Sequence, residues 1–355
     1  MNTLNTNDLT DDGDELARYA RQMRYAPIGS EGQRRLRAAR VLIVGCGALG
    51  SVLANTLARA GVGMLRVVDR DFLELNNLQR QVLYDEADVA SGLPKAVVAK
   101  QRLAQINSQV EVDAVVADVD HRNITRLVAN VDLILDGTDN FEIRYLLNDV
   151  AVEQGLPWIY GGCIGAVGQT MVVLPGETPC FRCLHPEPPP PGSTETCDTA
   201  GILAPIINVI ASVQTCEALK LLAGRREAVC RELQVFDLWE NRVRQIRLDA
   251  LREHSQCPAC VHRVFPWLTG QRGSHTAVLC GRNAVQLSFP EHPTLSLAAL
   301  AERLRGVGRV ASNNYLLRLS VEPHELIVFP DGRAIIQGTE DVAEARTLYA
   351  RYIGK

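Results

Sequence analysis

The stretch GCGALG, residues 45–50, constrains the fold of this chain more than any other feature. An apolar run, VLIV at 41–44, precedes it, and a helical pattern from Ala48 to Ala60 follows, so Gly45, Gly47 and Gly50 form a G-x-G-x-x-G turn between a strand and a helix. The next apolar run, MLRVVD, ends at Asp69. This order predicts a unit that holds phosphate at the helix N-terminus and ribose at the acid. It fits ATP and NAD equally well.

Strands and helices continue to alternate beyond this unit, which predicts an α/β fold: a Rossmann-like, doubly wound, mostly parallel sheet with helices on both faces. The expected helices are 14–25, 31–38, 95–106, 141–154 and 202–222. The expected strands are 110–116, 132–135, 158–160, 233–237 and 243–248.

The composition and pattern of the chain change in three places. Residues 1–13 are polar and acidic, and we expect a disordered tail there. Residues 184–201 are rich first in Pro and then in Ser and Thr, which predicts an exposed crossover loop within a main domain of residues 14–264. From 265 to 355 the pattern restarts and predicts a small C-terminal α/β domain. Its expected helices are 295–304 and 341–352, and its expected strands are 315–321, 326–329 and 334–337, with a tight turn at 330–332.

Charge and composition exclude some classes of partner. The net charge is −4 and the pI is about 6.0, so nothing draws the chain as a whole to nucleic acid or to an anionic membrane. The chain has neither the basic and apolar start of a secretion signal nor an apolar run of about 18 residues, which predicts a cytoplasmic protein that does not span a membrane. Ten cysteines that include two C-x-x-C pairs fit a reducing compartment.

The stretch NNLQRQVLYDEADVASGLPK, residues 76–95, favours ATP over NAD. Nucleophilic attack on the α-phosphate of ATP develops negative charge, and cations and amides can stabilise it. Asn77, Arg80 and Lys95, one of only four lysines, suit that task, and Asp139 in LDGTDN could hold magnesium. All four follow predicted strands, at the sheet edge where α/β proteins bind ligands.

The cysteines fall into three groups. Cys180, Cys183, Cys257 and Cys260 have the spacing of a closed, structural four-thiolate zinc site. Cys46, Cys163, Cys216 and Cys230 lie in apolar surroundings and are expected in the core. Cys197 lies in the crossover loop just before a helix-like segment, where a thiol ionises more easily; a plain exposed thiol is the other interpretation.

The motifs together resemble the MoeB/ThiF/HesA family of adenylyltransferases, the bacterial relatives of ubiquitin-activating enzymes. The resemblance covers residues 15–265 and keeps the family order. It rests on RYARQ (18–22), GCGALG (45–50), VVDRDFLELNNLQRQ (67–81), GLPKA (92–96), DGTDN (136–140), CFRC (180–183), CDTAG (197–201) and CPAC (257–260).

This resemblance implies a reaction in which the C-terminal Gly-Gly carboxylate of a ubiquitin-like sulfur-carrier protein, ThiS-like or MoaD-like, attacks the α-phosphate of ATP. An acyl-adenylate and pyrophosphate result, and no general base is needed because a carboxylate is already a nucleophile. The resemblance assigns Asp69 to the ribose, Asn77, Arg80 and Lys95 to the phosphates, and Asp139 to magnesium. The nucleotide-binding set it implies is Gly45, Gly47, Gly50, Asp69, Asp71, Asn77, Arg80, Lys95, Asp139 and Asn140.

The resemblance also implies partners. Arg21 of RYARQ matches an arginine that reaches the ATP of the neighbouring subunit, so a homodimer is expected. Cys197 matches a cysteine that links covalently to the carrier in thiamine-type and eukaryotic relatives. The C-terminal region is too short for a rhodanese domain, so a separate sulfur donor is expected, in a thiamine, molybdopterin or tRNA-thiolation pathway. The alternatives are an NAD-dependent oxidoreductase and a non-enzymatic, zinc-stapled binding scaffold.

Overall fold

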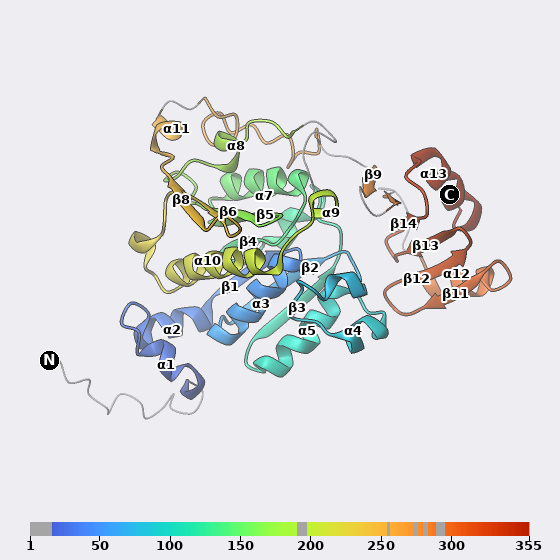
Figure 1. Cartoon of the computed structure of the whole chain (residues 1–355), viewed down its shortest axis with the longest axis horizontal. Coiled ribbons are helices and arrows are strands. Elements are labelled where there is room, and N and C mark those ends of the chain that lie inside the picture. Colours follow the sequence, from blue (N-terminus) through green and yellow to red (C-terminus); the bar gives the residue numbers. More distant parts are fainter. Residues whose placement is uncertain are drawn as a thin grey trace. The chain divides into compact units, whose positions relative to one another are not determined.

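The protein is described by a computed structural model that covers residues 16–189, 197–253, 256–272, 276–279, 283–288 and 295–354. The chain divides into two compact units. The first comprises Met1–Pro191 and Ile202–Gly270, and the second comprises Gly192–Gly201 and Gln271–Lys355. The predicted tail at 1–13 lies outside the described residues. Figure 1 labels the elements of both units.

The first unit is built on an eight-stranded sheet in the order β3-β2-β1-β4-β5-β6-β7-β8. The first five strands are parallel and the last three are antiparallel, which confirms the predicted mostly parallel, Rossmann-like fold. The strands are β1 (Arg40–Val44), β2 (Met64–Asp69), β3 (Glu111–Val116), β4 (Leu133–Asp136), β5 (Trp158–Ile164), β6 (Val167–Val173), β7 (Leu233–Asp237) and β8 (Arg242–Ile246).

Helices cover both faces of this sheet. One hydrophobic cluster joins the sheet to helices α3, α5 and α10, and a second joins its other face to α6, α7 and α8. The helices are α1 (Ala20–Met23), α2 (Gly29–Ala38), α3 (Ala48–Ala60), α4 (Glu86–Ser91), α5 (Lys95–Ile106), α6 (Ile124–Leu127), α7 (Phe141–Gln154), α8 (Phe181–Leu184), α10 (Ala204–Leu222) and α11 (Asp249–Glu253), with 3-10 turns at Ala17–Tyr19, Leu75–Asn77 and Arg226–Ala228. Residues 41–44 of β1 and 133–135 of β4 form continuous buried apolar runs, as expected for strands covered on both faces.

Several predicted elements differ from the structure. Instead of one helix over 14–25, the described part contains a 3-10 turn at Ala17–Tyr19 and the four-residue helix α1, which ends before Pro27. The sequence did not predict β6, and β5 runs four residues beyond its predicted end. These two strands pair as a hairpin through the turn at 165–166, where Gly165 has a φ of +57°. That turn changes the sheet from parallel to antiparallel.

Helix α10 is long and apolar enough to cross a membrane by length and composition alone. Its buried side chains, including Ile206, Ile210 and Gln214, instead pack into the core of the first unit, beside α3, β5 and β6. The hydropathy of α10 is therefore that of a core helix.

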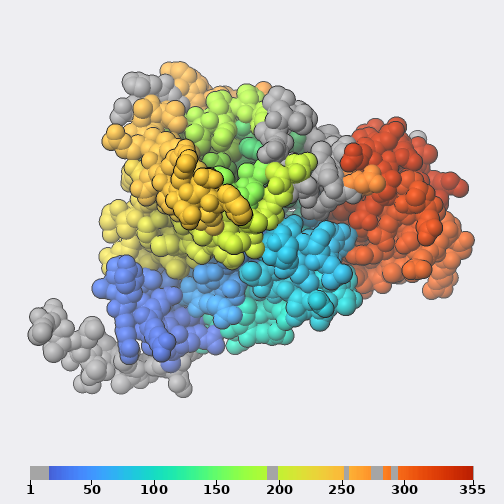
Figure 2. All heavy atoms as spheres, in the orientation of Figure 1, coloured from blue at the N-terminus to red at the C-terminus, as the bar shows by residue number. Residues whose placement is uncertain are grey.

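Strand β8 is the edge of the sheet and is exposed along its whole length. Val243 is 65% exposed, and Trp239, in the β7–β8 turn, is 75% exposed. In Figure 2 the gold segment that contains β8 lies on the face in view. Arg242 and Arg244 place charge on this edge strand, as is common where a sheet must not pair with other chains.

The second unit contains a six-stranded sheet in the order β11-β12-β13-β14-β10-β9, with antiparallel pairing throughout. Its strands are β9 (Thr276–Leu279), β10 (Ala284–Leu287), β11 (Arg309–Ser312), β12 (Leu317–Val321), β13 (His324–Val328) and β14 (Ala334–Gln337). Its helices are α9 (Cys197–Ala200), α12 (Leu297–Leu304) and α13 (Val342–Tyr352); α12 and α13 share one hydrophobic cluster with the sheet. The predicted tight turn lies between β13 and β14, where Gly332 has a φ of +82°.

Candidate nucleotide-binding site

Two glycine-containing turns meet at the carboxyl ends of β1 and β4. A Cβ atom on Gly50 would lie 1.9 Å from the carbonyl oxygen of Gly45, and one on Gly137 would lie 2.5 Å from the same oxygen. The Gly137 amide donates to Val44 O at 2.8 Å, which holds the second turn against β1. Gly47 stands at the N-cap of α3, and only Gln81 Nε2 lies within 4 Å of where its Cβ would be. A helix N-terminus with so little side chain around it can take a phosphate.

Asp69 joins the end of β2 to the glycine turn. Its Oδ2 accepts from the Cys46 amide at 2.6 Å, and its Oδ1 accepts from the Asp71 amide at 2.7 Å. Burial raises the pKa of the Asp69 carboxyl, and nearby Lys95 opposes that rise. Because a carboxylate can accept about four hydrogen bonds, the two backbone donors leave capacity for ribose hydroxyls.

Lys95 lies beside Asp69 at the first residue of α5. Its backbone amide donates to Asp71 O at 2.9 Å, and its ammonium pairs with Asp71 Oδ2 at 3.5 Å. The residue is only 4% exposed. The isolated β-bridge between Phe72 and Pro94 fixes the backbone just before it. A buried, pre-positioned ammonium is suited to a phosphate.

Asn77 and Arg80 lie in the short segment after β2. Asn77 is buried, and its side chain takes part in local structure: Oδ1 accepts from the Glu74 amide at 3.1 Å, and Nδ2 donates to Asn76 Oδ1 at 2.7 Å. Arg80 is half-buried and donates from Nη1 to Asn76 O at 2.9 Å. The structure therefore gives Asn77 a capping role in this 3-10 turn, in addition to the phosphate role expected from the sequence.

The turn after β4 carries Asp139 at the surface. No hydrogen bond or ion pair is described for its carboxylate, although its charge helps to raise the pKa of Arg70 and of Arg144. Asn140 caps α7, because its Oδ1 accepts from the Glu142 amide at 2.8 Å. The exposed Asp139 carboxylate is the type of oxygen ligand that magnesium prefers.

Beneath this turn lies a buried ion pair that the sequence did not reveal. Asp136 is fully buried, and its carboxylate accepts from Thr138 N at 2.8 Å, from Thr138 Oγ1 at 2.7 Å and from Arg144 Nε at 3.1 Å. Burial raises the pKa of Asp136, while Arg144 and Thr138 oppose the rise. Gln81 and Gln214 are further buried polar residues of the site that we did not predict. A polar residue inside an apolar helix, as at Arg144 and Gln214, is the only sequence signal that could have indicated them.

Arg21 does not lie with these residues in its own chain. Its neighbour Gln22 donates from Nε2 to Ala60 O at 2.9 Å, and the ring of Tyr19 packs where a Cβ on Gly61 would lie. Both contacts are at the C-terminal end of α3, whose 13 residues span about 20 Å. Arg21 itself is exposed, with no described partner.

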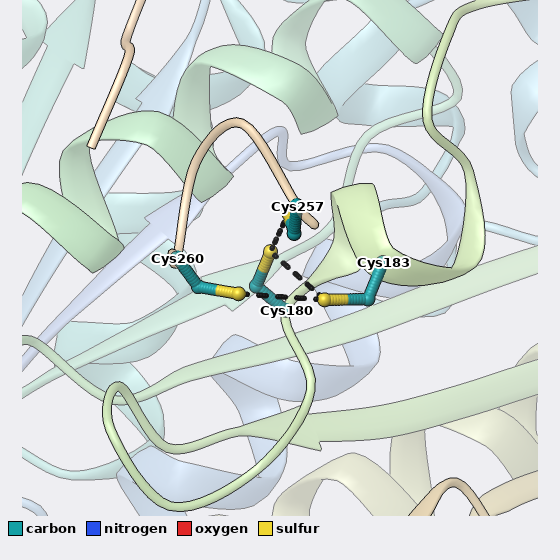
Figure 3. A group of neighbouring side chains, drawn as sticks. All are labelled: Cys180, Cys183, Cys257 and Cys260. Atoms are coloured by element: carbon teal, nitrogen blue, oxygen red, sulfur yellow. Dashed lines mark hydrogen bonds between the residues drawn. The ribbon is translucent and has the colours of Figure 1, made fainter. Parts of the chain in front are cut away.

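The two C-x-x-C pairs come together as a four-thiol cluster (Figure 3). Their sulfur atoms all lie within 4.8 Å of one another, with separations of 3.8 Å for Cys180–Cys183, 3.5 Å for Cys180–Cys257 and 3.4 Å for Cys183–Cys260. Four thiolates bound tetrahedrally to zinc would be about 3.8 Å apart. The cluster is therefore compatible with a closed zinc site.

The remaining cysteines differ in exposure. Cys46 is buried next to Tyr84, whose hydroxyl donates to its carbonyl oxygen at 2.9 Å, and burial raises the pKa of the Cys46 thiol to about 12. Cys163 and Cys230 are half-buried, but Cys216 is exposed, so its predicted core position is wrong. Because α10 is apolar around most of its circumference, its sequence did not indicate which face points outward. Cys197 begins α9, but its side chain, like Cys280, lies outside the described residues.

Comparison with known proteins identifies relatives of the first unit. The model of the ThiF family matches residues 19–259. The chain is 45% identical over 339 residues to the sulfur carrier protein ThiS adenylyltransferase of Bacillus subtilis (strain 168), covering 95% of this chain and 99% of that protein. It is 41% identical over 252 residues to the sulfur carrier protein adenylyltransferase of Thermus thermophilus, covering 70% of this chain and 91% of that protein.

Solved structures show the same fold. The crystal structure of E. coli MccB with ATP aligns with a TM-score of 0.60 at 22% identity, covering 72% of this chain and 75% of that one. The two alignments differ in how much of this chain they cover. An alignment of 339 residues must include most of the C-terminal unit, whereas one of 252 residues cannot cover both units in full.

Proposed function

The chain belongs to the ThiF family, and on that premise we propose that it is an ATP-dependent adenylyltransferase for a ubiquitin-like sulfur-carrier protein. A carboxylate oxygen at the carrier's C-terminal Gly-Gly attacks the α-phosphorus of ATP. The bond from that phosphorus to the bridging oxygen of the β-phosphate breaks, and pyrophosphate leaves with the electron pair. The product is a carrier acyl-adenylate.

One observation carries this proposal: the N-terminus of α3 and the exposed Asp139 carboxylate follow the adjacent strands β1 and β4, and the buried Lys95 ammonium is paired with Asp71, just after the neighbouring strand β2. Asp69 binds the ribose. Lys95, together with Asn77 and Arg80, neutralises the charge that grows on the phosphates. A hydride-transfer enzyme would need only the glycine turn and Asp69. The oxidoreductase alternative leaves the buried Lys95 unexplained, and the named relatives do not support it.

The central test measures exchange of labelled pyrophosphate into ATP, with and without a carrier that ends in Gly-Gly. We expect exchange that depends on the carrier and that stops when its last glycine is removed. Exchange that is absent, or that does not depend on the carrier, would rule out the proposed reaction. Reduction or oxidation of a nicotinamide cofactor by the same preparation would favour the oxidoreductase alternative.

Magnesium accompanies the nucleotide in this proposal. Asp139 fits it because its carboxylate is exposed at a strand end and has no described partner. When bound at Asp139, the ion would stabilise the negative charge that develops as pyrophosphate leaves. Asn140 flanks this position, while Asp71 positions Lys95.

We further propose a homodimer in which each Arg21 serves the partner's site. An extended arginine side chain reaches only about 7 Å from its Cα, while α3 separates the docked RYARQ segment from the glycine turn by about 20 Å. Within one chain Arg21 therefore cannot contact the phosphates. Mixing Arg21→Ala with Asp139→Ala subunits, each inactive alone, should restore about a quarter of wild-type exchange in a random mixture. No recovery after verified subunit mixing would remove Arg21 from the partner's site.

Zinc is the metal proposed for the cluster of Cys180, Cys183, Cys257 and Cys260, in a structural role, because all four positions of a tetrahedron would be filled by protein. Metal analysis of the purified protein should find about one zinc per chain. Zinc-free protein that melts at the same temperature as the zinc-bound protein would contradict this assignment.

The partners and place of action follow from the same reading. The name of the Bacillus relative supports a ThiS-like carrier, and the MoaD-like carrier expected from the sequence is the other candidate. We propose a cytoplasmic enzyme in which a separate donor supplies sulfur. The Cys197 thiolate attacks the carbonyl carbon of the carrier acyl-adenylate, AMP leaves with the electron pair, and a thioester to the carrier forms. We also propose that the C-terminal module, predicted from the sequence as residues 265–355 and divided from the first unit after Gly270 in the structure, binds a partner. A Cys197→Ser variant should keep carrier-dependent pyrophosphate exchange and lose any covalent carrier adduct seen by mass spectrometry.

A further inference from the structure

The turn that presents Asp139 is held in place by buried side chains. Asp136 is fully buried at the end of β4, and Arg144 is nearly so on α7. We infer that Asp136 and Arg144 form a lock that fixes the turn 137–139, and that Arg144 is a positioning residue which sets the response of the site to divalent metal. This inference rests on the proposed function, in which Asp139 holds magnesium.

The lock grips the turn through Thr138 from both sides. Asp136 Oδ1 accepts from the Thr138 amide and hydroxyl, while Arg144 Nη2 donates to the Thr138 carbonyl oxygen at 2.8 Å. Arg144 Nε closes the arrangement by donating to Asp136 Oδ2 at 3.1 Å. Both the N–H and the C=O of the residue just before Asp139 are therefore tied to one ion pair. The direction in which the backbone enters Asp139 is therefore restricted.

Other parts of the sheet hold the same ion pair in place. Gln214 on α10 donates from Nε2 to Asp136 O at 3.0 Å. The Arg144 guanidinium also donates to Gly161 O at 3.3 Å and lies 5.2 Å from the centre of the Tyr160 ring. Gly137 cannot move inward, because it already touches Gly45 and Gly50. The position of the Asp139 turn relative to the glycine turn is thus fixed by buried contacts on α7, α10 and β5.

A planar guanidinium is needed for this grip. Arg144 uses Nε toward Asp136 and Nη2 toward Thr138, two directions that a single ammonium cannot satisfy together. A lysine at this position would keep the charge opposite Asp136 but lose one of the two contacts. The turn would then loosen while the buried carboxylate stayed compensated.

The domain contains a second buried Arg–Asp pair that serves as a matched control. Arg182 and Asp149 are both buried, with Arg182 Nη1 3.4 Å from Asp149 Oδ1 and 3.1 Å from Val264 O. This pair lies beside the cysteine cluster, and within the described part of the chain its printed hydrogen bonds go to neither Thr138 nor Asp139. Any effect that comes only from weakening a buried ion pair should appear equally in both.

The test compares Arg144→Lys with Arg182→Lys in the full chain. A non-hydrolysable ATP analogue is titrated at increasing Mg²⁺ concentration, and thermal melting and pyrophosphate exchange are measured in parallel. Arg144→Lys should raise the Mg²⁺ concentration for half-maximal analogue binding about tenfold and lower kcat for exchange, with KM for the carrier nearly unchanged. Arg182→Lys should lower the melting temperature and leave the Mg²⁺ response as in wild type.

Equal Mg²⁺ responses for the two variants would overturn the inference. Should Arg144→Lys not fold, Thr138→Val replaces it, because this substitution removes only the hydroxyl contact to Asp136. It should raise the half-maximal Mg²⁺ concentration by about threefold, in proportion to one lost contact, and an unchanged value would also overturn the inference. Wild-type protein that shows neither exchange nor Mg²⁺-dependent analogue binding would instead refute the proposed function.

Discussion

The nucleotide site and the four-cysteine cluster are assembled in opposite ways. The cluster uses two short C-x-x-C pairs, and each pair supplies two adjacent thiols through local backbone geometry. The nucleotide site takes single residues from the ends of β1, β2 and β4 and from the start of α5. Each half of the cluster is thus specified by local sequence and the fold joins the two halves, whereas every residue of the nucleotide site is placed by strand order. This difference teaches that damage to the site should stop the reaction, while damage to the cluster should lower stability first.

The largest expected effect is that of Asp139→Ala, which should reduce carrier-dependent pyrophosphate exchange at least about 100-fold because it removes the exposed carboxylate at the β4 end. Melting should change little, since the side chain has no described partner. The matched control is Asp132→Ala, at the opposite end of β4, which loses one hydrogen bond to the Arg40 amide. The control should keep wild-type exchange. Near-normal exchange in Asp139→Ala would contradict the expectation that damage to the nucleotide site stops the reaction.

Lys95→Met should come next, with exchange lowered roughly 30- to 100-fold, mainly through weaker ATP binding. Methionine keeps much of the buried volume while it removes the ammonium that pairs with Asp71. The measurement is the KM for ATP together with kcat. The exposed Lys100 on the same helix, changed to Met, is the control and should behave as wild type.

Removal of metal from the cysteine cluster should have a moderate effect of another kind. Cys183→Ser, or a strong chelator, should lower the melting temperature by at least about 5 °C, because binding energy at such a site contributes directly to folding. Exchange measured well below the new melting point should stay within about threefold of wild type. A loss of exchange as large as that of Lys95→Met would mean that the cluster supports the reaction directly.

The smallest expected effect is that of Cys216→Ser. This thiol is exposed on the outer face of α10 and belongs to neither region, so both exchange and melting should match wild type within error. A clear change in either measurement would show that the face of α10 that carries Cys216 has a role that the structure does not reveal.

Sequence alone predicted the elements with strong periodicity. Helices 48–60, 95–106 and 141–154 and strands 64–69, 233–237 and 334–337 occupy the predicted residues. Each has a clear apolar period together with a glycine, proline or charged residue at its boundary. The gathering of Gly45, Asp69, Asp71 and Lys95 at one edge followed from strand order, because parallel strands bring their carboxyl ends together.

What the sequence could not indicate depends on contacts between distant segments. The pairing of β6 with β5 is set by a hairpin whose glycines also suit an irregular loop. The lock of Asp136 with Arg144 and Gln214 joins three elements, and none of these residues lies in a spacing that predicts their contact. The exposure of Cys216 was missed because α10 is apolar around most of its circumference and gives no directional signal.

The turns at Gly45 and Gly137 approach each other so closely that a Cβ atom on Gly45, Gly50 or Gly137 would lie within 3 Å of backbone atoms. Substitution of these glycines is therefore costly, since any added carbon would push the two strand ends apart. Changes in substrate preference must arise among the surrounding residues, such as those around Lys95 and Asp139. Relatives that act on different carriers should then differ in these surrounding residues and share the close backbone contact between the two glycine turns.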